Sequence, residues 1–507
     1  MNNQLIFGPP GTGKTYTLIG LVSDALAKGV RPERIAFVSF TKKAVEEAVN
    51  RAGQQFGLNY KELPYFRTLH SIAFRGLGLQ HQDVMAKSDW DFLADKLNMD
   101  FSGVTFVNPE EGMVIPPSGG TGTQYVQIIT KARYSKIPLE KAFKEAGDYN
   151  LHFFMLEKID ENLRAYKKGM MKFDFTDMID TYTQDIETPD LDLLIVDEAQ
   201  DLTPLQWDMV SKMSANSAFT YYAGDDDQAV HRWAGVDLKL FLNASDNKRV
   251  LTQSYRMPKA VHRLSQRVVK RISYRQPKEF KPTDQEGHVR SVMSVYDLPL
   301  ERGSWTVMAL TNSYAKQIYI KIMEMGYMCN LKTRKSVSTD TANALASWRQ
   351  LQAGGSITKS QTIAMYDAMP KRGTSASVKH GSKKLLDAVH EEDVLNYQNL
   401  SQNFGLIVPL EADAARALNL SGQEARYIEM LEARGEDILA PARIKVSTFH
   451  AMKGGEDDNC AVFLASTKRF SVDGDPDDLH RAFYVGLTRA RKNLFLIESN
   501  RPYRYDV

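Results

Sequence analysis

The segment Gly8-Pro-Pro-Gly-Thr-Gly-Lys-Thr15 limits the possible folds of this chain more than any other part of its sequence. An apolar, strand-like run, Gln4–Phe7, precedes it, and a helical pattern follows it to about Lys28. Glycines at these spacings let backbone N–H groups close around phosphate oxygens, and the start of a helix adds positive potential. A Gly-rich turn without a ligand would not require a strand before it and a helix after it. The segment therefore predicts a phosphate-binding loop in a parallel α/β fold.

Each residue of this loop is expected to help bind the cofactor, ATP. We expect Lys14 to reach the β- and γ-phosphates, and the Thr15 hydroxyl to bind Mg²⁺. The predicted phosphate-binding residues are Gly8, Pro9, Pro10, Gly11, Thr12, Gly13, Lys14 and Thr15.

A second apolar run, Leu193–Val196, ends in the carboxylates Asp197 and Glu198. Two carboxylates at the tip of a buried strand are costly unless they meet a cation or take part in proton chemistry. Asp197 fits a role in holding Mg²⁺, and Glu198 fits a role in polarising an attacking water. An acidic turn without chemistry is the alternative, and the nearby phosphate loop makes it the weaker one.

Strand-like and helical patterns alternate in two blocks, and a mostly helical stretch interrupts each block. The clearest helices in the first stretch are expected over Trp90–Leu97, Val126–Ala132 and Phe153–Tyr166. Because 507 residues are too many for one hydrophobic core, we expect two α/β cores, each with an insertion. The predicted ranges are 1–77 and 172–248 for the first core, 78–171 for its insertion, 249–330 and 441–507 for the second core, and 331–440 for its insertion.

Composition adds limits rather than a function. The net charge of +2 neither requires nor excludes nucleic acid, since a local basic groove is enough to hold a strand. Only two cysteines occur, Cys329 and Cys460, which excludes a cysteine-rich zinc site. No run approaches the roughly 20 apolar residues that a membrane helix needs, and no signal peptide is evident. A cytoplasmic location and no membrane partner are expected.

An ordered series of motifs resembles that of superfamily 1A DNA helicases, the UvrD/Rep/PcrA-like family. The phosphate loop and Asp197-Glu198-Ala-Gln-Asp201 resemble the two nucleotide motifs of that family, and seven further segments occur in the family's order. They begin at Phe37, Thr68, Phe173, Gly224, Gln253, Val446 and Phe483. The resemblance implies two RecA-like cores that use ATP and Mg²⁺. It also implies 3′→5′ movement on single-stranded DNA and contact with a single-strand/duplex junction. A monomer in solution is expected, and the second insertion is a candidate surface for a protein partner.

The resemblance assigns roles around the nucleotide. Gln228 would sense the γ-phosphate, Arg256 and Arg489 would reach it as arginine fingers from the second core, and Gly454 and Glu456 would lie at the ribose. Tyr16 and Tyr255 could sandwich the purine, or simply be packed aromatics. Two features depart from the family. Tyr16 stands where an Arg is usual, and no adenine-reading glutamine lies well upstream of the loop, so weak base selectivity is expected.

The DNA track is also assigned by resemblance. Trp233 would stack on a base, although an isolated Trp is more often a core residue. Phe40, Thr41, His70 and His450 match positions that touch bases or backbone in the family. Lys371 and Arg372 would contact duplex phosphates, with a flexible basic loop as the equal alternative.

Three functions remain open from the sequence. The first is a helicase that separates duplex DNA. The second is a translocase that displaces proteins from single strands without much unwinding. The third is a DNA-gated ATPase subunit that signals to a partner. The sequence indicates no biological pathway.

Overall fold

The computed structural model describes residues 2–39, 42–104, 119–147 and 150–507. The chain divides into two compact units. The first comprises residues 1–262, 266–285 and 474–484, and the second comprises residues 263–265, 286–473 and 485–507.

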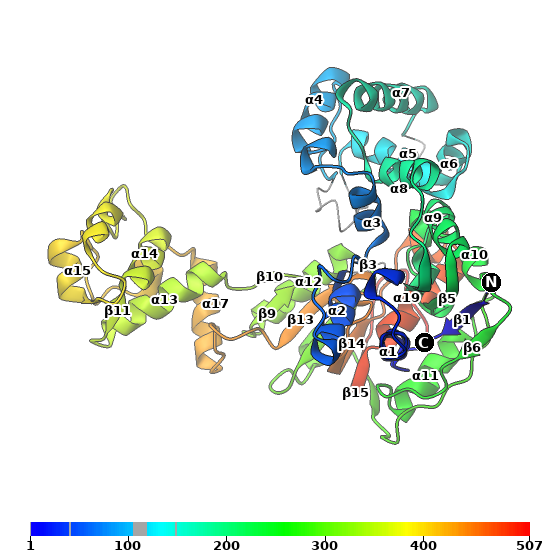
Figure 1. Ribbon diagram of the computed structural model, residues 1–507. Helices are drawn as coiled ribbons and strands as arrows, with labels where there is room; N and C mark the ends of the chain where they lie inside the picture. The colour runs from blue at the N-terminus through cyan, green and yellow to red at the C-terminus, as the bar shows by residue number, and fades with distance from the viewer. Residues whose placement is uncertain (1, 40–41, 105–118, 148–149) are drawn as a thin grey trace. The chain divides into compact units, whose positions relative to one another are not determined.

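A six-stranded, all-parallel sheet forms the centre of the first unit (Figure 1). In spatial order its strands are β3 (Tyr65–Arg67), β2 (Ile35–Ser39), β4 (Leu191–Asp197), β5 (Ser217–Gly224), β1 (Asn2–Phe7) and β6 (Lys248–Val250). Because β5 lies between β1 and β4, the carboxyl ends of these three strands meet at one edge. The predicted phosphate loop and the predicted carboxylates leave the sheet at that edge.

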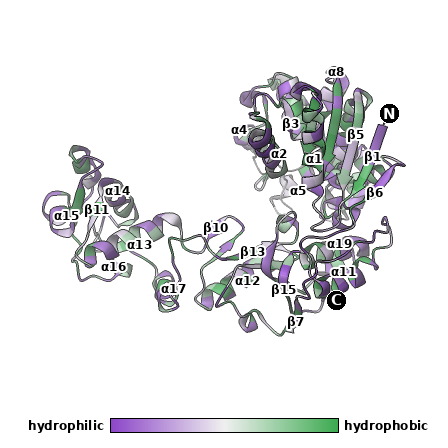
Figure 2. Cartoon of the chain, turned by 60° about the horizontal axis from the view of Figure 1, so that its bottom comes forward, coloured by the Kyte–Doolittle hydropathy of each residue, from purple (hydrophilic) through white to green (hydrophobic). Residues whose placement is uncertain are grey.

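Helices cover both faces of this sheet. Leu5 and Phe7 belong to the core on one face, whereas Ile6 between them belongs to the core on the other face. Strands that are buried on both faces have continuous apolar sequences, which is the pattern seen in residues 5–7 of β1 and 193–196 of β4. Green in Figure 2 marks hydrophobic residues, among them those of the two cores on either side of the sheet. The helices that follow or flank the strands are α1 (Lys14–Ala27), α2 (Lys42–Phe56), α3 (Leu69–Gly76), α8 (Phe175–Asp185), α9 (Pro204–Ala215), α10 (Leu238–Leu242) and α11 (Lys259–Val269).

Between α3 and α8, the described residues form four helices that share a hydrophobic core of their own, drawn from residues 85–163. Figure 1 shows them grouped together at the top of the view, above α3. They are α4 (Lys87–Leu97), α5 (Thr121–Ser135), α6 (Leu139–Ala146) and α7 (Phe153–Met170). The three helices expected from the sequence are confirmed in α4, α5 and α7, and the shared core lies within the predicted range of 78–171.

The second unit is built on a seven-stranded sheet, parallel except for its edge strand β10. In spatial order its strands are β10 (Arg334–Lys335), β9 (Cys329–Leu331), β13 (Ile444–Thr448), β8 (Trp305–Ala309), β14 (Asp457–Phe463), β15 (Ala490–Ile497) and β7 (His288–Val292). The amphipathic helix α12 (Asn312–Glu324) packs Ala315, Ile318 and Ile322 into the core on one face. A short helix, α18 (Lys468–Ser471), follows β14.

The second insertion has a separate core of residues 344–428. It contains α13 (Thr339–Gln352), α14 (Lys359–Ala368), α15 (Tyr397–Asn403), α16 (Ala414–Leu418) and α17 (Gly422–Ala433). Two strands absent from the sequence prediction, β11 (Ser356–Thr358) and β12 (Val394–Asn396), pair antiparallel within it. Each is three residues long, too short to produce a detectable alternation.

The structure differs from the sequence-based prediction at the boundary between the two cores. β6 pairs with β1 in the first sheet, and the first unit continues to Gln285, beyond the expected start of the second core at residue 249. The helix α19 (Pro476–Leu487) also begins in the first unit and ends in the second. Its first turns are held by the Asp477 carboxylate, which accepts hydrogen bonds from the backbone N–H groups of Ser273 and Tyr274 at 2.8 and 3.0 Å.

Candidate nucleotide site

The phosphate loop joins the carboxyl end of β1 to α1. Gly11 and Gly13 have φ values of 74°, in the left-handed region that favours glycine. Among the described residues, no side chain caps the start of α1, and its first turn carries no acidic residue. The first backbone N–H groups of α1 can therefore serve an anion. The loop fits a nucleotide phosphate in its backbone conformation as well as in its sequence.

Lys14 lies beside the two carboxylates at the end of β4. Its Nζ forms a salt bridge with Asp197 and lies 2.6 Å from Oε1 of Glu198. Burial opposes the charge on Lys14, but both carboxylates outweigh that effect and raise the pKa of Lys14 above its ordinary value. Burial also raises the pKa of Asp197, as does the charge of Glu198, while Lys14 opposes that shift. The carboxylates thus carry more negative charge than one lysine satisfies, which suits the oxygen-ligand chemistry of Mg²⁺.

Tyr16, Tyr255 and Arg256 gather around the same loop. A Cβ at Gly13 would lie 3.8 Å from the Tyr255 ring and 3.9 Å from Cβ of Tyr16. Both tyrosines are largely exposed, at 70% and 76%, so neither is a packed core aromatic. The backbone N–H of Tyr255 donates to the Gly11 carbonyl at 2.8 Å. These exposed rings are available to a planar base beside the phosphate loop.

Arg256 belongs to the same compact unit as the loop, whereas the sequence placed it in the second core. A Cβ at Gly11 would lie only 2.4 Å from Cβ of Arg256, so the absence of a side chain at Gly11 permits this approach. The reason for the difference is β6, which continues the first sheet and leads directly into residues 253–257. Gln4 lies near the start of β1, whereas the phosphate loop follows the end of that strand. The side-chain amide of Gln4 donates to Oδ1 of Asn247 at 3.2 Å.

Gln228 lies at the edge of a buried cluster of charges that sequence reasoning missed. Its Nε2 donates to Oδ2 of Asp225 at 2.7 Å. Lys278, fully buried, forms ion pairs with Asp225, Asp226 and Asp227, and Arg275 binds Asp227 through two contacts of 2.7 Å. The three carboxylates lie close enough to suggest a metal site, but Lys278 supplies their countercharge. The signal in the sequence was the run of three aspartates, since buried carboxylates require a cation.

The predicted residues of the second unit lie around the start of β14 and the end of α19. Arg489 is buried, and its guanidinium donates to the carbonyls of Val485 and Gly455 at 2.8 and 3.3 Å. Gly454 has a φ of 75°. Glu456 lies 3.3 Å from Arg491 in an ion pair, and His450 opens the turn that follows β13. The structure therefore brings Arg489 next to the Gly454–Glu456 segment.

The predicted DNA contacts fall in different surroundings. Trp233 is 47% exposed, which opposes the interpretation as a core residue. His70 is buried against Phe175 and Tyr134, and burial lowers its pKa to about 4. The structure places His70 in the core rather than on a surface, because α3 packs against α8. Lys371 pairs with Asp367 at 3.2 Å and Arg372 is exposed. Phe40 and Thr41 lie outside the described residues.

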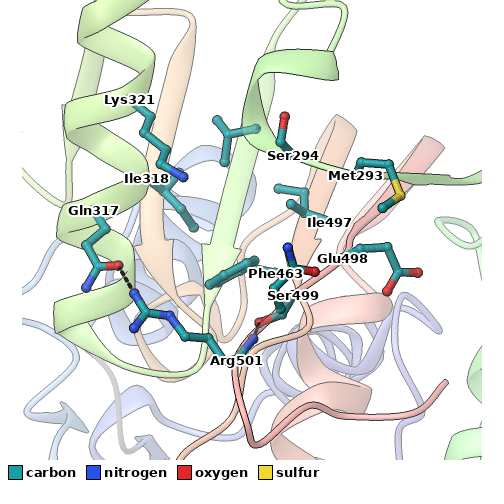
Figure 3. Close-up of a pocket in the computed structure, with 12 residues that line it drawn as sticks. Met293, Ser294, Gln317, Ile318, Lys321, Phe463, Ile497, Glu498, Ser499 and Arg501 are labelled. Carbon is teal, nitrogen blue, oxygen red and sulfur yellow. Dashed lines mark hydrogen bonds between the residues drawn. The ribbon is translucent and has the colours of Figure 1, made fainter.

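A cavity of about 370 Å³ opens at the carboxyl ends of β7 and β15 in the second unit (Figure 3). Lys321 of α12 and Phe463 of β14 line it, and Arg501 donates to Gln317 at 3.0 Å. Its lining residues include none of the predicted site residues, so it is separate from the nucleotide site.

A phosphate loop after the first strand and a pair of carboxylates at the end of a nearby parallel strand define a RecA-like P-loop protein. The UvrD/REP helicase N-terminal domain matches residues 1–249, and the UvrD-like helicase C-terminal domain matches residues 158–501. The second match alone covers more than half of the chain, and the chain belongs to the UvrD/Rep family of superfamily 1 helicases.

Several curated proteins are similar to this chain. The ATP-dependent DNA helicase PcrA of Bacillus subtilis (strain 168) is 26% identical over 304 residues, which are 56% of this chain and 39% of the relative. PcrA of Staphylococcus aureus (strain COL) is 24% identical over 291 residues, 54% of this chain and 39% of the relative. The YjcD protein of B. subtilis (strain 168) is 25% identical over 356 residues, 63% of this chain and 45% of the relative. The matched segments thus span less than half the length of these relatives.

In the described part of the chain, no helix is long and apolar enough to cross a membrane.

Proposed function

We propose that this chain hydrolyses ATP to move along single-stranded DNA in the 3′→5′ direction and to separate duplex DNA ahead of it. The observation that carries the proposal is the contact of Lys14 with both Asp197 and Glu198 at the phosphate loop. Phosphoryl transfer to water requires a cation at the phosphates, a carboxylate that binds the metal and a carboxylate that polarises the water. In this proposal Lys14, Asp197 and Glu198 have these three roles in that order. Membership of the UvrD/Rep family supports DNA as the substrate on which that energy is spent.

Each residue of the site has a chemical task in this proposal. The backbone N–H groups of the loop and Lys14 bind and orient the phosphates, and Thr15 and Asp197 hold Mg²⁺. ATP supplies the phosphoanhydride bond whose hydrolysis releases the energy. Glu198 holds the attacking water and draws a proton from it. Gln228 detects the terminal phosphate, and Arg256 and Arg489 stabilise the charge that develops during transfer.

The direct test is strand displacement with duplexes that carry either a 3′ or a 5′ single-stranded tail, beside an ATPase assay with and without DNA. We expect unwinding of the 3′-tailed duplex and ATP hydrolysis that single-stranded DNA stimulates. Movement without strand separation would instead indicate a protein-displacing translocase. DNA-stimulated hydrolysis without movement would indicate a gated ATPase subunit. Hydrolysis that ignores DNA would contradict all three.

Trp233 provides a test of coupling between the nucleotide and the DNA. It lies five residues after Gln228, so one short segment joins γ-phosphate sensing to base stacking. Losing one stacked base costs roughly 1–3 kcal/mol, enough for the strand to slip during a cycle. We expect Trp233→Ala to weaken single-strand affinity moderately and to reduce unwinding more than ATPase at saturating DNA.

The measurement for Trp233→Ala is the number of ATP molecules consumed per base pair opened, which should rise. Phe154→Ala is a matched control, because Phe154 is also an exposed aromatic residue but lies on α7, away from these motifs. An unchanged ratio in the Trp233 variant would mean that Trp233 is a passive contact.

A further inference from the structure

Gln200 lies between the carboxylate Glu198 and the end of β5. It sits on the turn Ala199–Asp201 and is 1% exposed. Its Nε2 donates to Oε2 of Glu198 at 2.7 Å and to Oδ2 of Asp201 at 3.0 Å, and its Oε1 accepts from the backbone N–H of Asp225 at 3.1 Å. Both N–H donors and the carbonyl of this buried amide are therefore engaged, which fixes its orientation.

Gly224 makes the approach to β5 possible. A Cβ at this position would lie 2.1 Å from Oε1 of Gln200 and 2.9 Å from the Phe241 ring. Only a residue without a side chain lets the Gln200 amide reach the N–H of Asp225. The next link leads to the predicted γ-phosphate sensor, because Asp225 accepts a hydrogen bond from Gln228 at 2.7 Å. One hydrogen-bonded chain thus joins Lys14, Glu198, Gln200, Asp225 and Gln228.

Glu198 requires such support. Its φ of 54° places it in the left-handed region, which costs a non-glycine residue free energy and persists where surrounding contacts hold it. Lys14 contacts one carboxylate oxygen and Gln200 contacts the other. Under the proposed function, Lys14 also binds phosphates. The Gln200 contact does not depend on Lys14, so it continues to orient Glu198 when Lys14 is engaged elsewhere.

We propose that Gln200 is a positioning residue, which orients Glu198 toward the attacking water and ties that orientation to the Asp225–Gln228 segment. This inference rests on the proposed ATP hydrolysis. It assigns Gln200 no contact with the nucleotide, so its loss should affect turnover and leave nucleotide affinity in place.

Gln200→Met tests the inference, because methionine has a similar length and cannot replace the hydrogen bonds. A misplaced catalytic group costs about 100-fold in rate, and we expect a loss of kcat of that order in the DNA-stimulated ATPase. The affinity for a non-hydrolysable ATP analogue, measured by fluorescence titration, should stay close to that of the unmodified protein. Gln206→Met is the matched control, since Gln206 is a buried amide that caps α9 with Thr203. The control should lower Tm and leave kcat near its original value.

A second measurement needs no nucleotide. Hydrogen exchange of the peptide that contains Asp225 should be faster in Gln200→Met, because the acceptor of the Asp225 N–H is lost. Gln200→Glu separates the effect of the contact with Asp225 from the effect of the contact with Glu198. It keeps an acceptor for Asp225 but sets a carboxylate against Glu198, so exchange should stay slow while kcat falls as in the methionine variant.

Two results would overturn the inference. One is a kcat for Gln200→Met that equals that of the unmodified protein. The other is a parallel loss of analogue affinity and kcat, which would make Gln200 a general support of the site. If the unmodified protein itself hydrolyses no ATP, the proposed function fails and this role falls with it. If the unmodified protein hydrolyses ATP and the variant matches it, only the role of Gln200 is wrong.

Discussion

Replacing Lys14 with alanine is expected to abolish ATP hydrolysis and to leave much of the single-strand binding intact. Removing one fixed group that stabilises developing charge lowers kcat by about 100- to 1,000-fold. Lys14 also contacts Asp197 and Glu198, so its loss leaves two carboxylates without this cation at the phosphate loop. We therefore expect the upper end of that range or beyond.

The measurements for Lys14→Ala are DNA-stimulated ATPase and fluorescence anisotropy with a labelled single-stranded oligonucleotide. Lys28→Ala is a suitable control, because Lys28 is an exposed lysine at the other end of α1. The control should resemble the unmodified protein in both assays. Substantial turnover by Lys14→Ala would contradict the assignment of the phosphate loop.

Among the substitutions described, replacing Lys278 with methionine is expected to lower the free energy of unfolding most. Lys278 is buried and pairs with three aspartates, and burial opposes its charge less than those carboxylates favour it, so its pKa is raised. Removing one partner from a buried ion pair costs about 3–5 kcal/mol, because the remaining charge is left uncompensated. A domain of this size loses roughly 2–4 °C in Tm per kcal/mol, so we expect a fall on the order of 10 °C.

The loss should depend on pH in a defined direction. Burial and the charges of Asp227 and Asp226 already raise the pKa of Asp225 to about 6, and Lys278 opposes that rise. Without Lys278 the pKa of folded Asp225 rises further above the unfolded value. A raised carboxyl pKa contributes stability at low pH that disappears as pH rises through the folded pKa. The deficit of Lys278→Met should therefore shrink as the pH falls from 7 toward 5.

Thermal unfolding at several pH values checks this prediction. Lys87→Met is the matched control, since Lys87 pairs with Asp91 on an exposed helix surface, where an ion pair contributes at most about 1 kcal/mol. A Tm for Lys278→Met within the range of the control would mean that the three carboxylates are protonated or solvated without Lys278.

Local motifs made the parts of the candidate nucleotide site predictable. The phosphate loop and the Asp197-Glu198 pair each occupy a few consecutive residues, and the apolar runs before them place both at strand ends. The parallel sheet brings those ends together, as the alternation of strands and helices predicted. The longer helices were also predictable, because α4, α5 and α7 have enough turns to show an apolar face.

Long-range partners were not predictable from the same patterns. Lys278 and Arg275 lie about 50 residues after the aspartates that they neutralise, and no periodicity connects them. β3, β6, β9, β11 and β12 have only three residues each, and their pairing depends on neighbours that are distant in sequence. Arg256 was assigned to the second core by resemblance, whereas the unpredicted strand β6 leads it into the first unit. His70 was assigned to the DNA by its motif, while its burial follows from the packing of α3 against α8. The roles of Trp233, Lys371, Arg372 and His450 at the DNA remain predictions, as do the polarity and the domain boundaries other than the one near residue 249.

The place of β1 between β5 and β6 in the first sheet matters for how the chain is made. Both neighbours of β1 come late in the sequence, since β5 begins at Ser217 and β6 at Lys248. At about 5–20 residues per second, roughly 200 residues take about 10–40 s to synthesise. During that interval Leu5, Ile6 and Phe7 leave the ribosome before the strands that will bury them exist. The phosphate loop is therefore translated early and assembled late, and the apolar residues just before it have no strand to pair with until β5 and β6 have been made.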